Sequence, residues 1–394
     1  MNDTDRDKDR GRSGGADRPL TSRQRCPALR DYGYDEERAA EFAAATTDER
    51  DEPARVVESS RGSCRIVCGG PAGDVEEMPA TTSGSLLHSS DTSAELPSVG
   101  DWIVARRPPD GGSAQIRAVL SRRTAFARKA PGDAEHDKIE AQVIAANIDI
   151  AVIVAAAGRD WNPRRVERYL TVAYESGARV LLAITKADLA EDIEGLEAEA
   201  ELAAPCVPRS LVCALDGRGM DVLREAFAPA LSVVLLGSSG AGKSTLLNTL
   251  AGEKLADTGE VRADDQRGRH TTTRRQLYKL DSGALVIDTP GLRELQLLVE
   301  GDAIDAAFPE IEAAAELCRF RDCRHASEPG CAVIAAVESG AIDRGRYESW
   351  RKLGKESAFL RARVDHAAKD AERRRWKSIE KSMRPFRNRS SRGG

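Results

Sequence analysis

The spacing of hydrophobic and polar positions changes along the chain and divides it into segments of different character. Residues 1–27 are rich in Asp, Arg, Gly and Ser and have almost no apolar side chains, so they cannot bury enough surface to offset the entropy of ordering. They are predicted to form a disordered tail. Residues 34–45 follow a short helical pattern, and the pattern changes again after Pro53.

Brief apolar runs separated by turn residues occupy the next segment. Gly69-Gly70 and the Pro/Asp/Gly run at residues 108–112 are its strongest turn signals. About five short strands in about 75 residues suit an OB-type barrel, a fold that often binds nucleic acid or oligosaccharide. The barrel is predicted over residues 53–128, with strands at 55–57, 64–68, 100–106 and 115–120.

A third pattern begins near residue 149, where solid apolar runs alternate with helical stretches. Such uninterrupted runs are typical of strands that are buried on both faces of a parallel sheet. The pattern predicts an α/β domain with a mostly parallel sheet over residues 140–300. Its expected strands are residues 150–157, 180–184, 231–236 and 284–287.

The last part of the chain is helical and then basic. Residues 301–360 are predicted to form a helical domain around a group of Cys and His residues. Residues 361–394 hold 12 Lys and Arg against 4 Asp and Glu, an excess of 8 positive charges in a chain of net charge -5. This tail suits RNA phosphates, with Trp376 or Phe386 stacking on a base, or else it is a solvated charged helix. Arg106-Arg107 and Arg122-Arg123 form a second basic region near the barrel.

A glycine-rich run at residues 237–244 lies between the apolar run 231–236 and a helical pattern over 245–251. A strand, such a turn and a helix are the context of a phosphate loop. The backbone N–H groups surround the phosphates, Lys243 neutralises charge on the β- and γ-phosphates, and the Ser244 hydroxyl binds Mg²⁺. The expected phosphate-site residues are Gly237, Ser238, Ser239, Gly240, Ala241, Gly242, Lys243, Ser244 and Thr245.

A guanine-reading motif, Thr185-Lys186-Ala187-Asp188, follows the apolar run 180–184. The Asp188 carboxylate accepts hydrogen bonds from guanine N1–H and N2–H₂, a donor pair that adenine lacks, while Lys186 packs along the base. Cys213 and Ala214 end a further strand, where a small residue lets a backbone N–H approach guanine O6. An ordinary GTPase has the phosphate loop first, so this order of motifs predicts a circularly permuted P-loop GTPase domain.

Residues that sense the γ-phosphate are expected on two switches. Asp288 and Gly291, after the run 284–287, suit a water-mediated contact to Mg²⁺ and a γ-phosphate sensor. The Gly-Arg-His-Thr-Thr-Thr run at 268–273 supplies hydroxyls for Mg²⁺. Thr272 is the candidate ligand, with Thr271 and Thr273 as the alternatives. Leu292 stands where many GTPases have a glutamine that orients water, so the site needs another group or another molecule for this role. His270 is the candidate catalytic residue beside Lys243, and the alternative is that His270 is simply an exposed switch residue.

Cys318, Cys323, His325 and Cys331 have a C-x4-C-x-H-x5-C spacing. Three thiolates and one imidazole suit a single tetrahedral ion, and a closed Cys₃His site is structural zinc because no open position remains for water. The alternative is a group of buried cysteines without metal.

Composition adds limits to this interpretation. With 394 residues the chain is long enough for several domains, and 31% charged with 4% aromatic residues is typical of a soluble protein. A cytoplasmic protein is predicted from the two absences that follow, and a monomer is expected. No run approaches the roughly 20 apolar residues of a membrane span, and the N-terminus has no secretory pattern.

Together these motifs resemble those of the ribosome small-subunit-dependent GTPase A proteins, which are bacterial assembly factors of the 30S subunit. The similarity runs from about 97 to 357 and includes Val99-Gly100-Asp101-Trp102, residues 142–149, the permuted motifs, the 268–273 run and the metal cluster. It implies a multidomain α/β protein with an N-terminal OB-type β-barrel, a permuted GTPase domain and a C-terminal helical zinc-binding domain. It also implies Mg²⁺ with bound GTP or GDP, 16S rRNA and the 30S subunit as partners, GTP hydrolysis stimulated by that subunit late in its maturation, and assistance from His270.

The chain departs from this family at Thr185, where Asn is usual, and at Cys213, where Ser is usual. A threonine hydroxyl is still able to hold the loop. The alternatives are a nucleotide-gated RNA-binding adaptor with little turnover, and a permuted GTPase that acts on another ribosomal particle. An ATP-dependent kinase or transporter ATPase leaves the motif at 185–188 unexplained.

Overall fold

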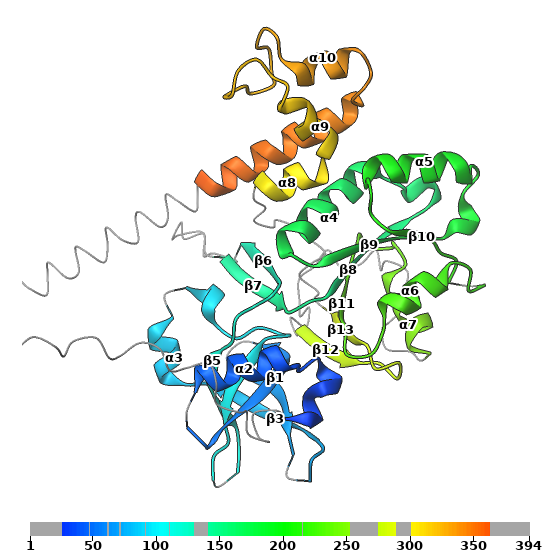
Figure 1. Cartoon of the computed structure of the whole chain (residues 1–394). Coiled ribbons are helices and arrows are strands. Elements are labelled where there is room, and N and C mark those ends of the chain that lie inside the picture. The colour runs from blue at the N-terminus through cyan, green and yellow to red at the C-terminus, as the bar shows by residue number, and fades with distance from the viewer. Residues whose placement is uncertain are drawn as a thin grey trace, which may run out of the picture.

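The computed structural model describes residues 26–46, 48–60, 63–70, 72–90, 92–109, 111–129, 141–214, 216–252, 275–288 and 301–362. Three parts follow one another along the long axis of the molecule: a barrel, a sheet flanked by helices, and a helical end (Figure 1). The predicted tail 1–27 lies outside the described residues except for its last two, and the basic tail 361–394 except for its first two.

The barrel is built from β1 (Asp51–Ser60), β2 (Ser63–Gly69), β3 (Val75–Thr82), β4 (Trp102–Arg106) and β5 (Ala114–Val119). The strand order is β1-β2-β3-β5-β4, and β4 pairs back onto β1, so the barrel closes. Helix α3 (Gly84–Ser89) and the turn η2 (Ser93–Glu95) connect β3 to β4. Small and branched side chains fill the interior: Ala54, Val56, Ile66, Cys68, Ala80, Ile103, Ala105, Ala114 and Ile116.

Strand β3 is the barrel strand that the hydrophobic pattern did not predict. Its sequence, VEEMPATT, exposes or half-buries every side chain except Ala80. A strand without an apolar face has no period-2 signal, and its internal proline argues against a strand. Strand β3 exists because it pairs with β2 on one side and β5 on the other.

Before the barrel, the turn η1 (Pro27–Tyr32) leads into helix α2 (Glu36–Ala45). Asp35 caps α2 by accepting a hydrogen bond from the Arg38 backbone N–H at 2.8 Å. After the barrel, β6 (Ala125–Lys129) and β7 (Ala141–Ala146) form a separate antiparallel pair.

The central sheet has the strand order β10-β9-β8-β11-β13-β12. All neighbouring pairs are parallel except β12 with β13. Helices α4 and α5 pack on one face of the sheet, and α6 and α7 on the other. Its elements are β8 (Ile150–Ala156), η3 (Gly158–Asp160), α4 (Pro163–Ser176), β9 (Arg179–Thr185), η4 (Ala187–Leu189), α5 (Ile193–Ala203), β10 (Arg209–Leu211), α6 (Met220–Ala226), β11 (Ser232–Leu236), α7 (Lys243–Ala251), β12 (Arg275–Lys279) and β13 (Leu285–Asp288).

The barrel and the central sheet are joined into one 11-stranded sheet among the described residues. The end of β1 pairs with β12, where Glu58 lies opposite Gln276. Arg55 secures this junction from within, because its buried guanidinium donates to Tyr32 O, Gly100 O, Asn147 O and Ser232 Oγ. Burial lowers the pKa of Arg55 to about 10, which leaves the group charged at neutral pH.

The C-terminal part consists of α8 (Gly301–Ala307), α9 (Pro309–Ala315), α10 (Ala332–Glu338) and a helical stretch over 344–362. It packs on α4 of the central layer, where the buried Arg346 donates to Glu167 Oε1 at 3.2 Å. Burial raises the pKa of Glu167. The positive charges of Arg164 and Arg346 act in the opposite direction and lower this pKa. None of the described helices is long and apolar enough to cross a bilayer.

Candidate functional site

The glycine-rich run lies where a phosphate loop belongs, between β11 and α7. Gly237 approaches the neighbouring strand so closely that a Cβ would lie 2.3 Å from Val154 O, which excludes any side chain there. Gly242 begins α7 with φ of 89°, a left-handed conformation that favours glycine. Lys243 folds back over the loop, and its Nζ donates to Gly237 O at 2.7 Å and Ser238 O at 2.5 Å.

The predicted base-reading residues lie beside this loop. Thr185 ends β9, and its buried hydroxyl donates to Ala241 O of the phosphate loop at 2.6 Å. The threonine therefore ties the base-reading loop to the phosphate loop, as expected for the hydroxyl that replaces the usual Asn. Lys186 has a left-handed backbone conformation, and its Nζ lies 3.8 Å from Asp160 Oδ2. The Asp188 side chain is exposed.

The remaining base-loop residues follow β10, the next strand in the sheet. The Ala187 N–H donates to Val212 O at 3.3 Å, so the two loops lie side by side. Cys213 is buried and its N–H donates to Arg218 O at 3.1 Å, while Ala214 is half-buried. Since the carboxyl ends of parallel strands meet at one edge of a sheet, these predicted base-site residues share the edge that carries the phosphate loop.

Of the predicted switch residues, Asp288 alone lies within the described chain. It ends β13, pairs in register with Gln276 of β12, and has an exposed side chain. Strand β13 is the direct neighbour of the phosphate-loop strand, so Asp288 reaches the same edge. His270, Thr272 and Gly291 lie outside the described residues.

The four predicted metal ligands gather at one point in the C-terminal part. Their ligand atoms all lie within 4.8 Å of one another. Cys318 follows α9, and Cys331 caps α10. Burial lowers the pKa of His325, which favours the neutral imidazole that binds metal. The donor set and its clustering fit a metal ion.

The loop that carries these ligands is held by its own contacts. Tyr347 Oη donates to His325 O at 2.5 Å, and the rings of His325 and Trp350 lie 5.7 Å apart. The Glu328 carboxylate accepts backbone N–H groups of residues 324, 326 and 327, and these bonds lower its pKa to about 2. The ligands are therefore arranged by the loop and not by metal alone.

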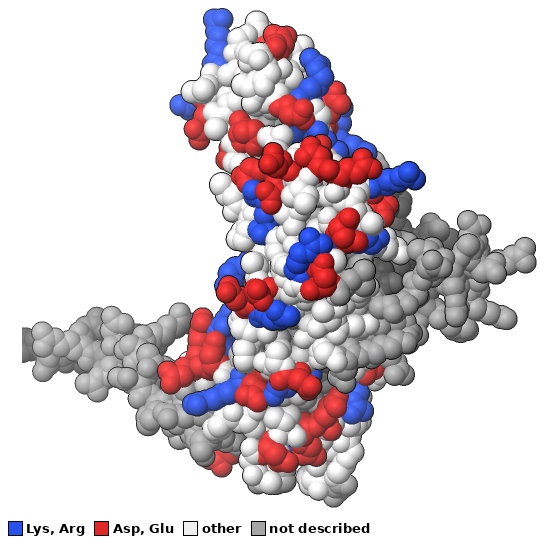
Figure 2. All heavy atoms as spheres, turned by 90° about the vertical axis from the view of Figure 1, so that its right-hand side faces the viewer, with Lys and Arg blue, Asp and Glu red and all other residues white. Residues whose placement is uncertain are grey.

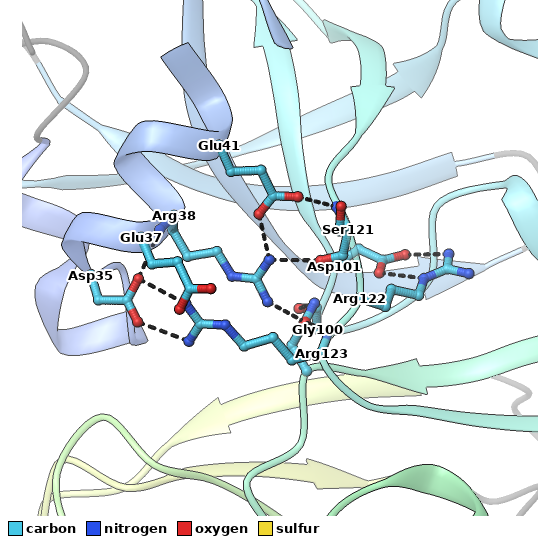
Figure 3. Close-up of polar contacts among 10 residues, drawn as sticks. Asp35, Glu37, Arg38, Glu41, Gly100, Asp101, Ser121, Arg122 and Arg123 are labelled. Carbon is cyan, nitrogen blue, oxygen red and sulfur yellow. Dashed lines mark hydrogen bonds and ion pairs between the residues drawn. The ribbon is translucent and has the colours of Figure 1, made fainter. Parts of the chain in front are cut away.

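The second basic region near the barrel is engaged within the molecule. Arg122 pairs with the buried Asp101, while Arg123 pairs with Asp35 and Glu37 of the N-terminal segment (Figure 3). Arg106 likewise pairs with Asp48 and Asp51. Arg107 pairs with Glu52 and Glu76. The sequence suggested that these four arginines bind RNA. In the structure their positive charge is compensated by carboxylates of the same molecule.

Figure 2 shows acidic and basic side chains interspersed over the face that carries α5. Helix α5 itself has four glutamates and no lysine or arginine. Among the described residues, this face does not offer a basic surface for nucleic acid.

Sequence reasoning missed one residue at the phosphate loop. Arg165, in the first turn of α4, places its Nη1 3.1 Å from Ser238 Oγ. The signal available was Asn162-Pro163, a helix start that follows β8 and the turn η3 and puts the following arginines at the same sheet edge as the nucleotide motifs.

Comparison with known proteins agrees with this geometry. The family model described as RsgA GTPase matches residues 119–298. The "Small ribosomal subunit biogenesis GTPase RsgA" of Opitutus terrae is 45% identical over 341 residues, which make up 84% of this chain and 90% of that protein.

Two solved structures share the fold. YjeQ from Thermotoga maritima is 25% identical, with a TM-score of 0.56 over 78% of this chain and 99% of its own. YloQ, described as a circularly permuted GTPase, is 21% identical, with a TM-score of 0.54 over 79% of this chain and 98% of its own. With its motifs, fold and relatives in agreement, the chain belongs to the RsgA GTPase family and is a circularly permuted GTPase.

Proposed function

We propose that this chain hydrolyses GTP to GDP and phosphate as a late-stage assembly factor of the small ribosomal subunit. The observation that carries the proposal is the 45% identity, over 84% of this chain and 90% of the relative, to a small ribosomal subunit biogenesis GTPase. The contact of Thr185 with the phosphate loop supports a nucleotide site in which base and phosphates are read by adjoining loops.

In the proposed site, Asp188 and Lys186 read guanine, and Cys213 and Ala214 let a backbone N–H reach O6. Residues 237–245 hold the phosphates, with Lys243 against the β- and γ-phosphates. Mg²⁺ is held by Ser244 and Thr272 and, through water, by Asp288, while Gly291 senses the γ-phosphate. These roles are supported by the position of the described site residues, which lie on neighbouring strands at one edge of the sheet.

The proposed metal is one structural zinc ion. With Zn–S of about 2.3 Å and Zn–N of about 2.0 Å, a tetrahedral site has S···S edges of about 3.8 Å and S···N edges of about 3.5 Å. Cys318 Sγ lies 3.9 Å from Cys331 Sγ, and these sulfurs lie 3.5 and 3.6 Å from His325 Nδ1. These separations support zinc bound by Cys318, Cys331 and His325, and Cys323 Sγ lies within 4.8 Å of their ligand atoms as the proposed fourth ligand.

The proposed domains are a tail at 1–27, the barrel at 53–128, the GTPase domain at 140–300, the zinc domain at 301–360 and a basic tail at 361–394. The barrel, the zinc domain and the basic tail are proposed to contact 16S rRNA, in a protein that is cytoplasmic and monomeric. The exposed Phe320 and Leu317 beside the metal ligands suit a docking surface on the particle.

The direct test is phosphate release from GTP and from ATP, with the protein alone and with added 30S, 50S or 70S particles. Slow GTP turnover that is accelerated chiefly by 30S is the expected result. Equal rates with every particle contradict the small-subunit assignment, and negligible turnover throughout favours the nucleotide-gated adaptor. A preference for ATP contradicts the roles of Asp188 and Lys186.

His270→Ala is expected to leave GTP binding intact and to lower stimulated turnover by about 10²-fold, since a group that orients or activates water acts only in the chemical step. The measurement is 30S-stimulated phosphate release beside nucleotide affinity. His88→Ala, which removes an exposed histidine of α3, is the matched control. Unchanged stimulated turnover in His270→Ala removes this histidine from the mechanism.

A further inference from the structure

Two cationic side chains from different elements converge on Ser238 of the phosphate loop. Lys243 Nζ, from α7, contacts Ser238 O at 2.5 Å, and Arg165 Nη1, from α4, contacts Ser238 Oγ at 3.1 Å. Like charges repel, so two cations gathered on a glycine-rich loop of backbone N–H groups favour an anion between them. In a GTPase the anion at this loop is the triphosphate.

Two neighbouring arginines of α4, Arg164 and Arg168, form ion pairs with the C-terminal part instead. Arg164 Nη2 pairs with Asp343 at 2.8 Å, and Arg168 Nη2 pairs with Glu356 at 2.6 Å, both in the C-terminal part. Among the described residues Arg165 forms no ion pair with a carboxylate, and its side chain is exposed. Helix α4 thus turns two arginines toward the C-terminal helices and one toward the phosphate loop.

The backbone of Arg165 is held in place. Its N–H donates to the Asn162 side chain at 3.1 Å, which caps α4. On the following turn Glu167 is fully buried between Arg164 and Arg346, so the helix start is clamped against the C-terminal part. An arginine on a clamped helix contacts a phosphate without a rearrangement of the backbone, and its planar guanidinium offers several donors in a fixed arrangement.

The reaction also needs such a group. Leu292 occupies the position where many GTPases have a water-orienting glutamine, and the proposed function gives that role to His270. Stabilising the charge that develops on the γ-phosphate is a separate role, which an arginine fills in other GTPases.

We propose that Arg165 is a catalytic residue for GTP hydrolysis, supplied in cis by α4, whose guanidinium contacts the γ-phosphate oxygens in the transition state. In this step a bond forms between a water oxygen and the γ-phosphorus, the bond from that phosphorus to the β–γ bridging oxygen breaks, and the water protons end on phosphate and solvent. GDP leaves with the bridging oxygen. This inference rests on the proposed function.

The test compares Arg165→Ala with Arg168→Ala, which removes an arginine from the same helix without touching the phosphate loop. Three quantities are measured for wild type and both variants: kcat and KM for GTP, affinity for GDP, and affinity for GDP with aluminium fluoride, which mimics the transferring phosphoryl group. We expect Arg165→Ala to lower kcat by about 10²-fold and to weaken aluminium fluoride binding in proportion, with GDP affinity within about threefold of wild type. Arg168→Ala keeps all three.

Equal kcat and equal aluminium fluoride affinity in the two variants overturn the proposal. So does a loss of GDP affinity that parallels the loss of kcat in Arg165→Ala, because the side chain then maintains the loop and does not act on the transition state. A wild-type protein that fails to hydrolyse GTP, alone and with 30S, contradicts the proposed function itself, whereas active wild type with an unaffected Arg165→Ala contradicts this inference alone.

Discussion

Lys243→Ala is expected to abolish GTP hydrolysis, alone and with ribosomal particles. Its ammonium group lies over the phosphate loop, 2.7 Å from Gly237 O, where no other lysine among the described residues contacts the loop. Removing a charge that stabilises the transferring phosphoryl group costs about 10²–10³-fold in kcat, which takes a slow GTPase below detection. Phosphate release under saturating GTP measures this loss.

The control for this variant is Lys355→Ala, which removes an exposed lysine from the C-terminal helical stretch. It is expected to keep wild-type turnover. Lys243→Ala should keep its folded core, because the Lys243 side chain is only half-buried and points at loop carbonyls. Turnover in Lys243→Ala equal to that of Lys355→Ala would show that the loop at 237–244 is not the hydrolytic site.

Cys331→Ser is expected to release the bound metal and unfold the C-terminal part. A structural zinc site contributes about 10–16 kcal/mol of apparent binding energy at pH 7 in zinc-finger peptides, and much of it appears as folding energy. Cys331 is buried and caps α10, so its loss removes a ligand and a helix cap together. We expect metal content to fall from about one ion per chain to near zero, with loss of hydrogen-exchange protection over 301–362.

Cys206→Ser is the matched control, because Cys206 is an exposed cysteine of the central layer. It should retain the metal. GDP binding should survive in both variants, since the phosphate-loop strand and α7 pack in a separate core beneath the sheet. Retained metal and unchanged protection in Cys331→Ser would contradict the assignment of Cys331 as a ligand.

Patterns within short stretches of sequence predicted much of this molecule. A buried strand, a glycine-rich turn and a helix start are consecutive in the chain, so residues 231–251 show a phosphate loop without tertiary information. The same holds for the metal ligands, which lie within 14 residues of one another and which the structure gathers into one cluster. The order of the two nucleotide motifs was enough to predict a circular permutation, which is how the solved structure of YloQ is described.

Other features depend on segments that are distant in the chain. Strand β3 has no apolar face and is defined by its pairing partners, and β1 joins the central sheet through β12 more than 200 residues later. Nothing local to Arg55 shows that its guanidinium will be buried among four segments, one of them β11.

The arginine charges show most clearly which features are local to the sequence and which depend on tertiary contacts. The sequence by itself determined the type, spacing and order of the candidate nucleotide and metal residues, because these are local properties of the chain. Only the tertiary structure decided which arginines are compensated: Arg106, Arg107, Arg122 and Arg123 face carboxylates, while Arg165 faces the phosphate loop. The physical reason is that the free charge of a side chain depends on what packs against it, and packing brings together residues that the sequence keeps apart.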